Sequence, residues 1–370
     1  KGIPRFYWKE ARIIDWENIQ SYFLNKTRGV DIALIGGSFT ADIYNTSRIA
    51  DILKQINKSC LTVVGGTHVS ALPQQTLEEF PNIDIVVMGE GEYIAKELIK
   101  AVSEGKSYRG IKGIAYRDET GRAVIEDRVA PMADINELPF PSRDLMPLDK
   151  YRLIWRKIQT GPGGGFIADP AGLVISSRGC IRQCLFCAIK EISGGYMRLR
   201  NAENVINEIE ELVRDYKISV LGFLDDFFTV DSERTLKICK ALKKMKLRWY
   251  CYGIVNTISE GLLREMKDSG CRLISFGLES GGQAILNKIG KGITLEQVEK
   301  ALALTRKVGI KYIASFTIGM PGESEETIKK TVRMIKNFGG IDVGLYRITP
   351  YPGSPLYRMA IKNNWFIYVI

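Results

Sequence analysis

The feature that most constrains the fold is a repeated alternation of short apolar runs and amphipathic helical patterns. Continuous apolar runs indicate strands buried on both faces, and helices between them join parallel neighbours. The alternation therefore predicts an α/β fold. It occurs in two series, before residue 128 and after residue 170, in a chain of 370 residues. Because a chain of this length ordinarily forms two domains, we expect one domain from each series.

The first series predicts a Rossmann-like, doubly wound domain over residues 1–127. Its main apolar runs each end at glycines, and such strand ends form the ligand-binding edge of open α/β sheets. A final pair of runs around a turn predicts a terminal hairpin. The expected strands are 11–15, 30–35, 61–64, 83–88, 111–116 and 123–126, with helices over 47–56 and from 92 to about 102.

A second domain is expected over residues 171–358. Six apolar runs alternate there with five helical patterns, which predicts a (β/α)6 partial TIM barrel with its functional residues at the carboxyl ends of the strands. Asn201 and Ser259 are expected N-caps, and Gly270 and Gly309 expected helix ends. Residues 359–370 are expected to begin a truncated C-terminal segment.

The stretch between the two series, residues 128–170, has a different composition. It holds six of the 13 prolines and a glycine-rich run at 161–165. Proline and glycine at this density interrupt regular structure. We therefore expect a linker or a loop laid over the surface rather than a folded unit.

Composition limits where the protein works and what it contacts. The sequence holds no apolar run of membrane-spanning length and no signal peptide at its start, so we expect neither a membrane span nor export. The formal net charge of +10 arises mainly after residue 150. This excess indicates either a solvated basic surface or attraction to an anionic partner.

Cysteine usage indicates metal binding in a reducing compartment. An odd count of seven does not suit a disulfide framework, and three of them fall within eight residues. We therefore expect a cytoplasmic protein. The other four, at positions 60, 239, 251 and 271, lie in apolar segments and are expected to be core residues.

The crowded cysteines form the strongest motif in the chain. Cys180, Cys184 and Cys187 have the spacing C-x3-C-x2-C and directly follow the first strand of the second series. Thiolates are the usual ligands of iron–sulfur clusters, and three of them leave one iron of a 4Fe–4S cluster open to a further ligand. Zinc would require a fourth Cys or His, and the only histidine, His68, lies in the first series.

From about residue 172 to 357, this motif and its surroundings resemble the radical S-adenosylmethionine (radical SAM) superfamily. The resemblance extends to Asp225-Asp226 after the second strand, to 276–281 at the fourth, to 319–323 after the fifth and to 350–355. It implies that S-adenosylmethionine (SAM) binds the open iron. One electron from the cluster then yields a 5′-deoxyadenosyl radical.

The resemblance also implies roles for single residues. Phe186 would lie beside the adenine, and Asp225 and Asp226 would receive the methionine amino group. Glu279 and Ser280 would face the ribose or the methionine part. The ordinary alternatives are a core residue for Phe186, a helix-capping pair for the two aspartates and a surface charge for Glu279. Relatives often carry Arg at the position of Ile254, so a more apolar pocket is expected here.

The first series resembles the cobalamin-binding domains that precede many radical SAM enzymes. In such domains a Ser/Thr loop and a glycine pair line the pocket for the nucleotide tail, where the missing Cβ atoms allow close approach of the backbone. The usual first strand and its Asp-x-His-x-x-Gly loop are expected ahead of the present sequence, and His68 is not expected to bind cobalt. The residues implied are Ser38, Thr40, Gly65, Gly66, Gly89 and Glu90.

Together these features predict a radical SAM enzyme with a 4Fe–4S cluster, SAM and cobalamin as cofactors. The expected reaction is methyl transfer to an unactivated carbon of a small-molecule, lipid or peptide substrate. An external electron donor such as ferredoxin or flavodoxin is expected, and nucleic acid is not. The alternatives are a cobalamin-linked radical cyclase or rearrangement enzyme, a methylthiolase-like enzyme without cobalamin, and a non-enzymatic iron–sulfur sensor or electron carrier.

Overall fold

The computed structural model describes residues 29–37, 39–148 and 171–366, together with residues 20, 24 and 27. The strand expected at 11–15, Ser38 and most of the glycine-rich part of the expected linker lie outside the described residues. The chain divides into two compact units, Lys1–Pro131 and Met132–Ile370. Each unit has a sheet and a hydrophobic core of its own.

The first unit contains a five-stranded sheet in the order β1-β2-β3-β4-β5. The first three strands pair in parallel, and the last two form an antiparallel hairpin against β3. The runs of the first series from residue 30 onwards are therefore confirmed as strands. Their bounds are β1 (Ile32–Gly36), β2 (Leu61–Gly65), β3 (Ile85–Val87), β4 (Ile114–Arg117) and β5 (Ala123–Ile125).

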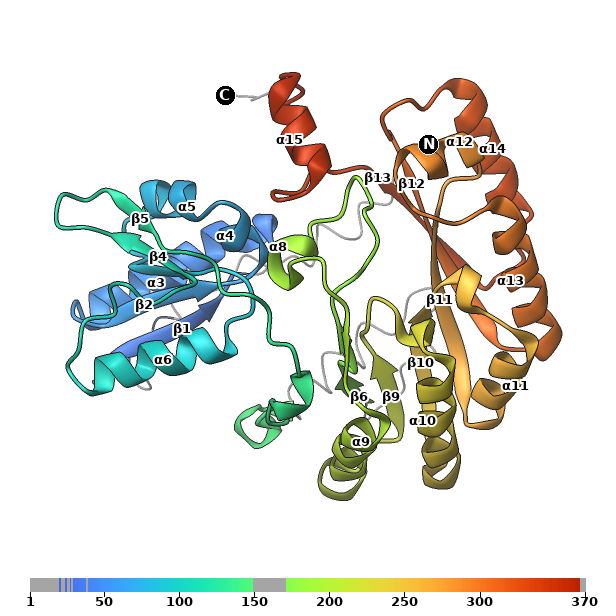
Figure 1. Ribbon diagram of the computed structural model, residues 1–370, viewed down its shortest axis with the longest axis horizontal. Helices are drawn as coiled ribbons and strands as arrows, with labels where there is room; N and C mark the ends of the chain where they lie inside the picture. The colour runs from blue at the N-terminus through green and yellow to red at the C-terminus, as the bar shows by residue number, and fades with distance from the viewer. Residues whose placement is uncertain are drawn as a thin grey trace. The chain divides into compact units, whose positions relative to one another are not determined.

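Helices cover both faces of this sheet (Figure 1). Successive side chains of a strand point to opposite faces, so Val86 packs into one core and its neighbour Ile85 into the other. Three helices lie over the first face and a fourth over the second, which is the doubly wound arrangement expected. They are α3 (Ile43–Ile56), α4 (Thr67–Ala71) and α5 (Pro73–Glu79) on one face, and α6 (Glu92–Ser103) on the other.

The second unit contains a six-stranded, fully parallel sheet. Its strands follow one another in space in chain order, so each β–α unit lies beside the next and the sheet is an open partial barrel, as predicted. The strands are β6 (Ala171–Val174), β9 (Val220–Phe223), β10 (Arg248–Gly253), β11 (Cys271–Glu279), β12 (Lys311–Ile318) and β13 (Asp342–Arg347).

Five long helices cover the outer face of this sheet (Figure 1). Trp249, Phe276 and Phe316 point outward from their strands and are fully buried in the core beneath the helices. The expected N-caps are confirmed, since Asn201 and Ser259 each accept a hydrogen bond from the first turn. The helices are α9 (Ala202–Tyr216), α10 (Ser232–Met245), α11 (Glu260–Asp268), α13 (Leu295–Val308) and α14 (Glu325–Lys336).

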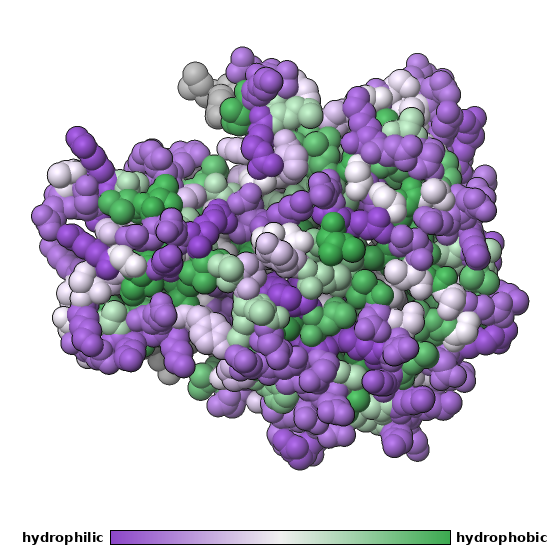
Figure 2. Space-filling model, viewed as in Figure 1, coloured by the Kyte–Doolittle hydropathy of each residue, from purple (hydrophilic) through white to green (hydrophobic). Residues whose placement is uncertain are grey.

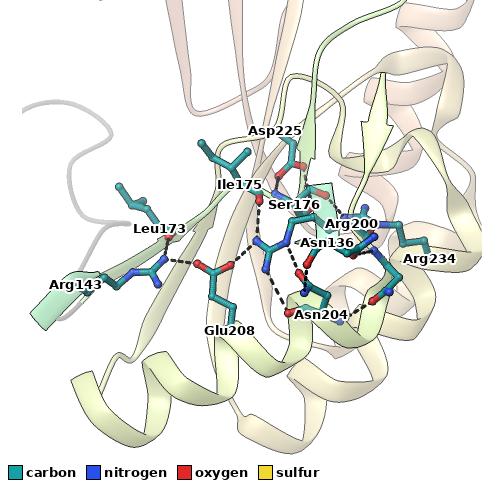
Figure 3. A network of polar contacts seen from close by, with 11 residues as sticks. Asn136, Arg143, Leu173, Ile175, Ser176, Arg200, Asn204, Glu208, Asp225 and Arg234 are labelled. Atoms are coloured by element: carbon teal, nitrogen blue, oxygen red, sulfur yellow. Dashed lines mark hydrogen bonds and ion pairs between the residues drawn. The ribbon is translucent and has the colours of Figure 1, made fainter. Parts of the chain in front are cut away.

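The segment that follows Pro131 is attached to the second unit by buried charges (Figure 3). Glu208 of α9 is buried and forms ion pairs with Arg143 and Arg200, one through each carboxylate oxygen. Arg143 also donates to the carbonyl of Leu173 at 3.0 Å. The backbone N–H of Asn201 donates to Oδ1 of Asn136 at 2.8 Å. Residues 132–148 therefore form a strap that is hydrogen-bonded to the barrel.

Polar side chains dominate the surface over the outer helices of the second unit in the view of Figure 2. Within the described ranges, no helix has the length and apolar character needed to cross a membrane.

Candidate active site

The second unit has a cavity of about 410 Å³ at the carboxyl ends of its strands. It is lined by residues from the segments after β7 (Ser177–Arg178), β9 and β10, from strands β10, β11 and β12, and from the loop after α12 (Gln283–Lys288). All three cysteines of the motif are among them. The structure therefore brings the cysteines to the functional end of the barrel, where catalytic groups of such folds lie.

Glycine and backbone hydrogen bonds fix the cysteine loop between β7 (Ser177–Arg178) and α8 (Lys190–Ser193). Gly179 has a φ of +85°, and a Cβ there would lie 1.8 Å from the carbonyl oxygen of Tyr196, so only glycine can begin this loop. The N–H of Leu185 donates to the carbonyl of Ile289 at 2.8 Å. This bond holds the loop against the end of α12.

The three thiols lie in a partly buried environment. Burial raises the pKa of Cys180 to about 11 and also raises the pKa values of Cys184 and Cys187. Without metal they are therefore neutral at physiological pH, and iron would have to displace their protons. The N–H of Arg182 donates to Sγ of Cys180 at 3.2 Å, a contact that stabilises a thiolate.

A single metal ion does not fit this site as well as a cluster. In the part of the chain that the structure describes, no three His, Cys, Asp or Glu side chains are grouped so that they could hold one metal ion. Three cysteines nevertheless line one cavity. Thiolates are the usual ligands of iron–sulfur clusters, so the residues present fit such a cluster by their chemistry.

The two adjacent aspartates have different environments. Asp225 is buried, and its carboxylate accepts hydrogen bonds from the backbone N–H of Ser176 at 3.2 Å and from Oγ of Ser176 at 2.8 Å (Figure 3). Oγ of Ser177 donates to the same carboxylate. Asp226 is exposed in the cavity, and no hydrogen bond or ion pair to another described residue is seen for it. Neither caps α10, whose N-cap is Asp231.

The pKa of each aspartate is raised, and the two carboxyl groups differ in which neighbours strengthen or oppose that rise. Loss of hydration is the main cause in each case, because Asp225 is buried and Asp226, although its side chain is open to the cavity, is surrounded by protein on most sides. At Asp225 the serine hydrogen bonds oppose the effect of burial, whereas at Asp226 the charge of Asp225 adds to it. Asp226 is therefore the carboxylate that would gain most from a cationic ligand.

The other residues implied for SAM are Phe186, which lies in the cavity wall, and Glu279 and Ser280, which lie at the end of β11. Phe186 lines the cavity. Glu279 is buried at the end of β11, where its carboxylate forms an ion pair with Lys291. Ser280 is buried too, with its Oγ 3.3 Å from Oγ1 of Thr331. Direct contact of Glu279 and Ser280 with SAM remains a prediction.

Two cations that line the cavity were not singled out from the sequence. Arg182 donates to the carbonyl of Gly292 at 2.7 Å, and Lys291 pairs with Glu279. No signal in the sequence separates Lys291 from the many other lysines of the chain. Arg182, inside the cysteine motif, could have been found from its position. Ile254 also lines the cavity and makes its wall apolar, as its sequence position suggested.

In the first unit, those predicted cobalamin residues that the structure describes gather at one edge of the sheet. Gly36 and Gly65 are neighbours in register at the ends of β1 and β2. Oγ1 of Thr40 lies 3.0 Å from Nδ1 of His68, which brings the loop after β1 to the loop after β2. The N–H of Gly89 donates to Oγ of Ser70 at 3.0 Å, and Glu90 follows it in the chain.

This edge leaves room for a ligand. An added Cβ at Gly36 would meet no described atom within 4 Å, and one at Gly65 would meet only Cβ of Val87, at 3.8 Å. Gly66 has a φ of +134°, which favours glycine. Burial lowers the pKa of His68, so its ring is neutral at physiological pH. The edge therefore offers backbone surface to a flat ligand, as the cobalamin prediction requires.

Comparison with known proteins identifies the family. A family model described as the radical SAM superfamily matches residues 174–335, and one described as the B12 binding domain matches residues 9–99. Over 330 residues the chain is 38% identical to the uncharacterized methyltransferase PH0819 of Pyrococcus horikoshii, with 88% of this chain and 68% of that protein covered. The chain belongs to the radical SAM superfamily. Its first unit carries a B12 binding domain, so the predicted family and fold class are confirmed.

Two further relatives span both units of this radical SAM enzyme. The anaerobic magnesium-protoporphyrin IX monomethyl ester cyclase of Rubrivivax gelatinosus is 29% identical, over 87% of this chain and 57% of that protein. A structure of the radical SAM methyltransferase TsrM from Kitasatospora setae, with cobalamin and a 4Fe–4S cluster bound, has a TM-score of 0.77 at 20% identity. It covers 95% of this chain and 67% of that one, and supports the fold. The chain thus spans between about half and two thirds of these proteins.

Proposed function

We propose that this enzyme transfers a methyl group to an unactivated carbon of its substrate in a cobalamin-dependent radical reaction. The observation that carries the proposal is the cavity of the second unit, where three cysteines lie together with Asp226, which has no partner among the described residues. The edge of the first unit's sheet where Gly36 and Gly65 are neighbours supplies a surface for cobalamin. The methyltransferase name of the Pyrococcus relative supports methyl transfer as the reaction.

Within this proposal, six of the residues that line the cavity have defined roles. Cys180, Cys184 and Cys187 would hold the cluster, which when bound supplies the electron that splits the sulfonium of SAM. Asp226 binds the ammonium group of SAM by a charge-assisted hydrogen bond. Phe186 packs against the adenine. The apolar side chain of Ile254 keeps water away from the carbon that reacts.

A cluster that splits SAM needs a supply of electrons. The other cysteines, which are 60, 239, 251 and 271, are all buried, as the sequence predicted. We therefore propose an external one-electron donor such as ferredoxin or flavodoxin. An open iron–sulfur site also favours the reducing conditions of the cytoplasm. The substrate is proposed to be a small molecule, a lipid or a peptide.

A radical cyclase is the second candidate, because a cyclase is among the relatives that span both units. The two reactions consume SAM differently. Methyl transfer converts one SAM to S-adenosylhomocysteine and a second to 5′-deoxyadenosine. Cyclisation yields 5′-deoxyadenosine alone. The products of SAM therefore separate the two candidates without knowledge of the substrate.

The test uses the protein loaded anaerobically with iron, sulfide and hydroxocobalamin, then given SAM and a chemical reductant. We expect both S-adenosylhomocysteine and 5′-deoxyadenosine by mass spectrometry, the former stoichiometric with bound corrinoid. The control is the variant with all three motif cysteines changed to Ala, which should yield neither. Formation of 5′-deoxyadenosine alone would favour the cyclase, and absence of both products from the loaded protein would overturn the proposal.

A further inference from the structure

An ion pair lies against the wall of the cavity. Nζ of Lys291 is 2.8 Å from Oε1 of Glu279, and the two side chains are only 18% and 9% exposed. Oγ1 of Thr317 donates to the second carboxylate oxygen of Glu279 at 3.0 Å. A pair that is shielded in this way from solvent keeps a fixed geometry and is screened much less by salt than a surface pair.

The local sequence makes room for this pair on strand β11. A Cβ at Gly277 would lie 2.8 Å from Oε1 of Glu279 and 2.9 Å from Nζ of Lys291, so the pair lies directly against the strand, in space that the glycine leaves open. The pairing of β11 with β12 shifts register between Gly277 and Glu279, and Glu279 has a φ of +65°. Such a conformation is unfavourable for Glu, and strain of this kind gathers at functional sites.

The ammonium of Lys291 belongs to the same cavity as the three motif cysteines. Its backbone is fixed by a hydrogen bond from its N–H to the carbonyl of Leu286 at 3.0 Å. The preceding residue, Gly290, has its carbonyl oxygen 3.8 Å from Sγ of Cys184. Lys291 therefore acts on the cluster site from the side of Cys184.

We propose that Lys291 sets the reduction potential of the iron–sulfur cluster, and that Glu279 and Thr317 are positioning residues that hold its ammonium in place. The inference rests on the proposed function, since it requires the cluster at the three cysteines. Reduction adds one negative charge to a cluster, and a fixed cation in a shielded cavity stabilises that charge. The carboxylate of Glu279 has the opposite effect and limits how far the cation raises the potential.

The test compares variants whose charge changes are opposite. Lys291→Met removes the cation and should lower the midpoint potential of the cluster. Glu279→Gln removes the anion with little change of shape and should raise it. The potential is measured by a reductive titration followed by electron paramagnetic resonance, with iron content determined for each protein. Lys288→Met is the matched control, because Lys288 lies in α12 but is exposed and does not line the cavity, and it should leave the potential near that of the unchanged protein.

Damage to the fold would not produce two shifts of opposite sign. If Lys291→Met fails to assemble a cluster, two other variants test the inference. Glu279→Gln should raise the midpoint potential of the cluster, and Lys291→Arg, which keeps the positive charge, should leave it nearly unchanged. Unchanged potentials, or shifts of the same sign in Lys291→Met and Glu279→Gln, would overturn the inference. If the unchanged protein assembles no cluster, the proposed function itself fails, and iron analysis distinguishes that result.

Discussion

Two neighbouring residues of the same type do different work in this cavity. Asp225 is committed to Ser176 and Ser177, whereas Asp226 has no partner among the described residues. The sequence predicted that both aspartates lie in the site but not which of them is free to bind a ligand. The reason is that the serines whose hydroxyl groups donate to Asp225 lie 48 and 49 positions away in the chain. The same limit applies to the ion pair of Glu279 with Lys291, whose two residues are 12 positions apart and belong to different elements.

Asp226→Asn is expected to weaken SAM binding about 10- to 100-fold, because a hydrogen bond to a charged group contributes roughly 1.5–3 kcal/mol. Affinity is measured by equilibrium dialysis on anaerobic protein loaded with iron and sulfide. Asp225→Asn should mainly lower the free energy of unfolding, since its carboxylate accepts three hydrogen bonds inside the fold. Undiminished affinity in Asp226→Asn would show that this carboxylate does not receive the ammonium.

Stability provides the control for this variant. The pKa of Asp226 is raised in the folded protein, first by burial and then by the charge of Asp225. Because this pKa is higher in the folded than in the unfolded protein, the ionised carboxylate lowers the free energy of unfolding at neutral pH. That loss disappears as the pH falls through the folded pKa and the group becomes protonated. Asp226→Asn should therefore be no less stable than the unchanged protein in urea denaturation at neutral pH. A loss of affinity with stability retained assigns the effect to the site.

Changing Cys180, Cys184 and Cys187 to Ala is expected to abolish iron binding, whereas the unchanged protein should bind about four irons per chain after anaerobic reconstitution. The measurement is iron and sulfide content together with the visible absorbance of the cluster. Cys251→Ala is the matched control, because this thiol is buried in the core beneath the helices and should leave iron binding intact. Retention of four irons in the triple variant would exclude the motif as the ligand set.

At the scale of elements, the sequence predicted the six strands and five long outer helices of the barrel because local signals mark them. Each strand is a continuous apolar run, and caps such as Asn201 and Ser259 mark helix starts. The strap over residues 132–148 was expected only as part of a linker. Its attachment depends on Arg143 and Glu208, which are 65 positions apart, and a pattern of neighbouring residues contains no sign of such a pair.

Glu208→Gln is expected to reduce the free energy of unfolding by about 3–5 kcal/mol, because removal of one partner from a buried ion network leaves charge unpaired. Here two arginines, Arg143 and Arg200, would lose their common anion. Urea denaturation measures the loss, and limited proteolysis should show faster cleavage within residues 132–148. Glu210→Gln, an exposed change on the same helix, should have almost no effect. Equal stability of the two variants would mean that the network does not hold the strap.

At the scale of the whole molecule, the chain consists of two units with separate cores and separate sheets. The sequence predicted this division from the interruption between its two series. It could not predict which glycines are required by the backbone and which leave space for a ligand. Gly66 belongs to the first kind because of its positive φ, and Gly65 to the second because a Cβ there meets only an ordinary contact.

Gly65→Val is therefore expected to fold normally and to lose cobalamin, because the valine side chain would occupy the surface that the corrinoid tail needs. The cluster should be kept, since the cysteines belong to the other unit and its separate core. His68→Ala should retain both cofactors, because His68 is predicted to be a wall residue that bonds to Thr40 rather than a cobalt ligand. Anaerobic absorbance with cobalt and iron analysis on the three proteins measures both outcomes. Cobalamin retained by Gly65→Val, or cobalt lost from His68→Ala, would contradict the assignment of this edge. If the unchanged protein binds no cobalamin, methyl transfer by this route would be excluded as well.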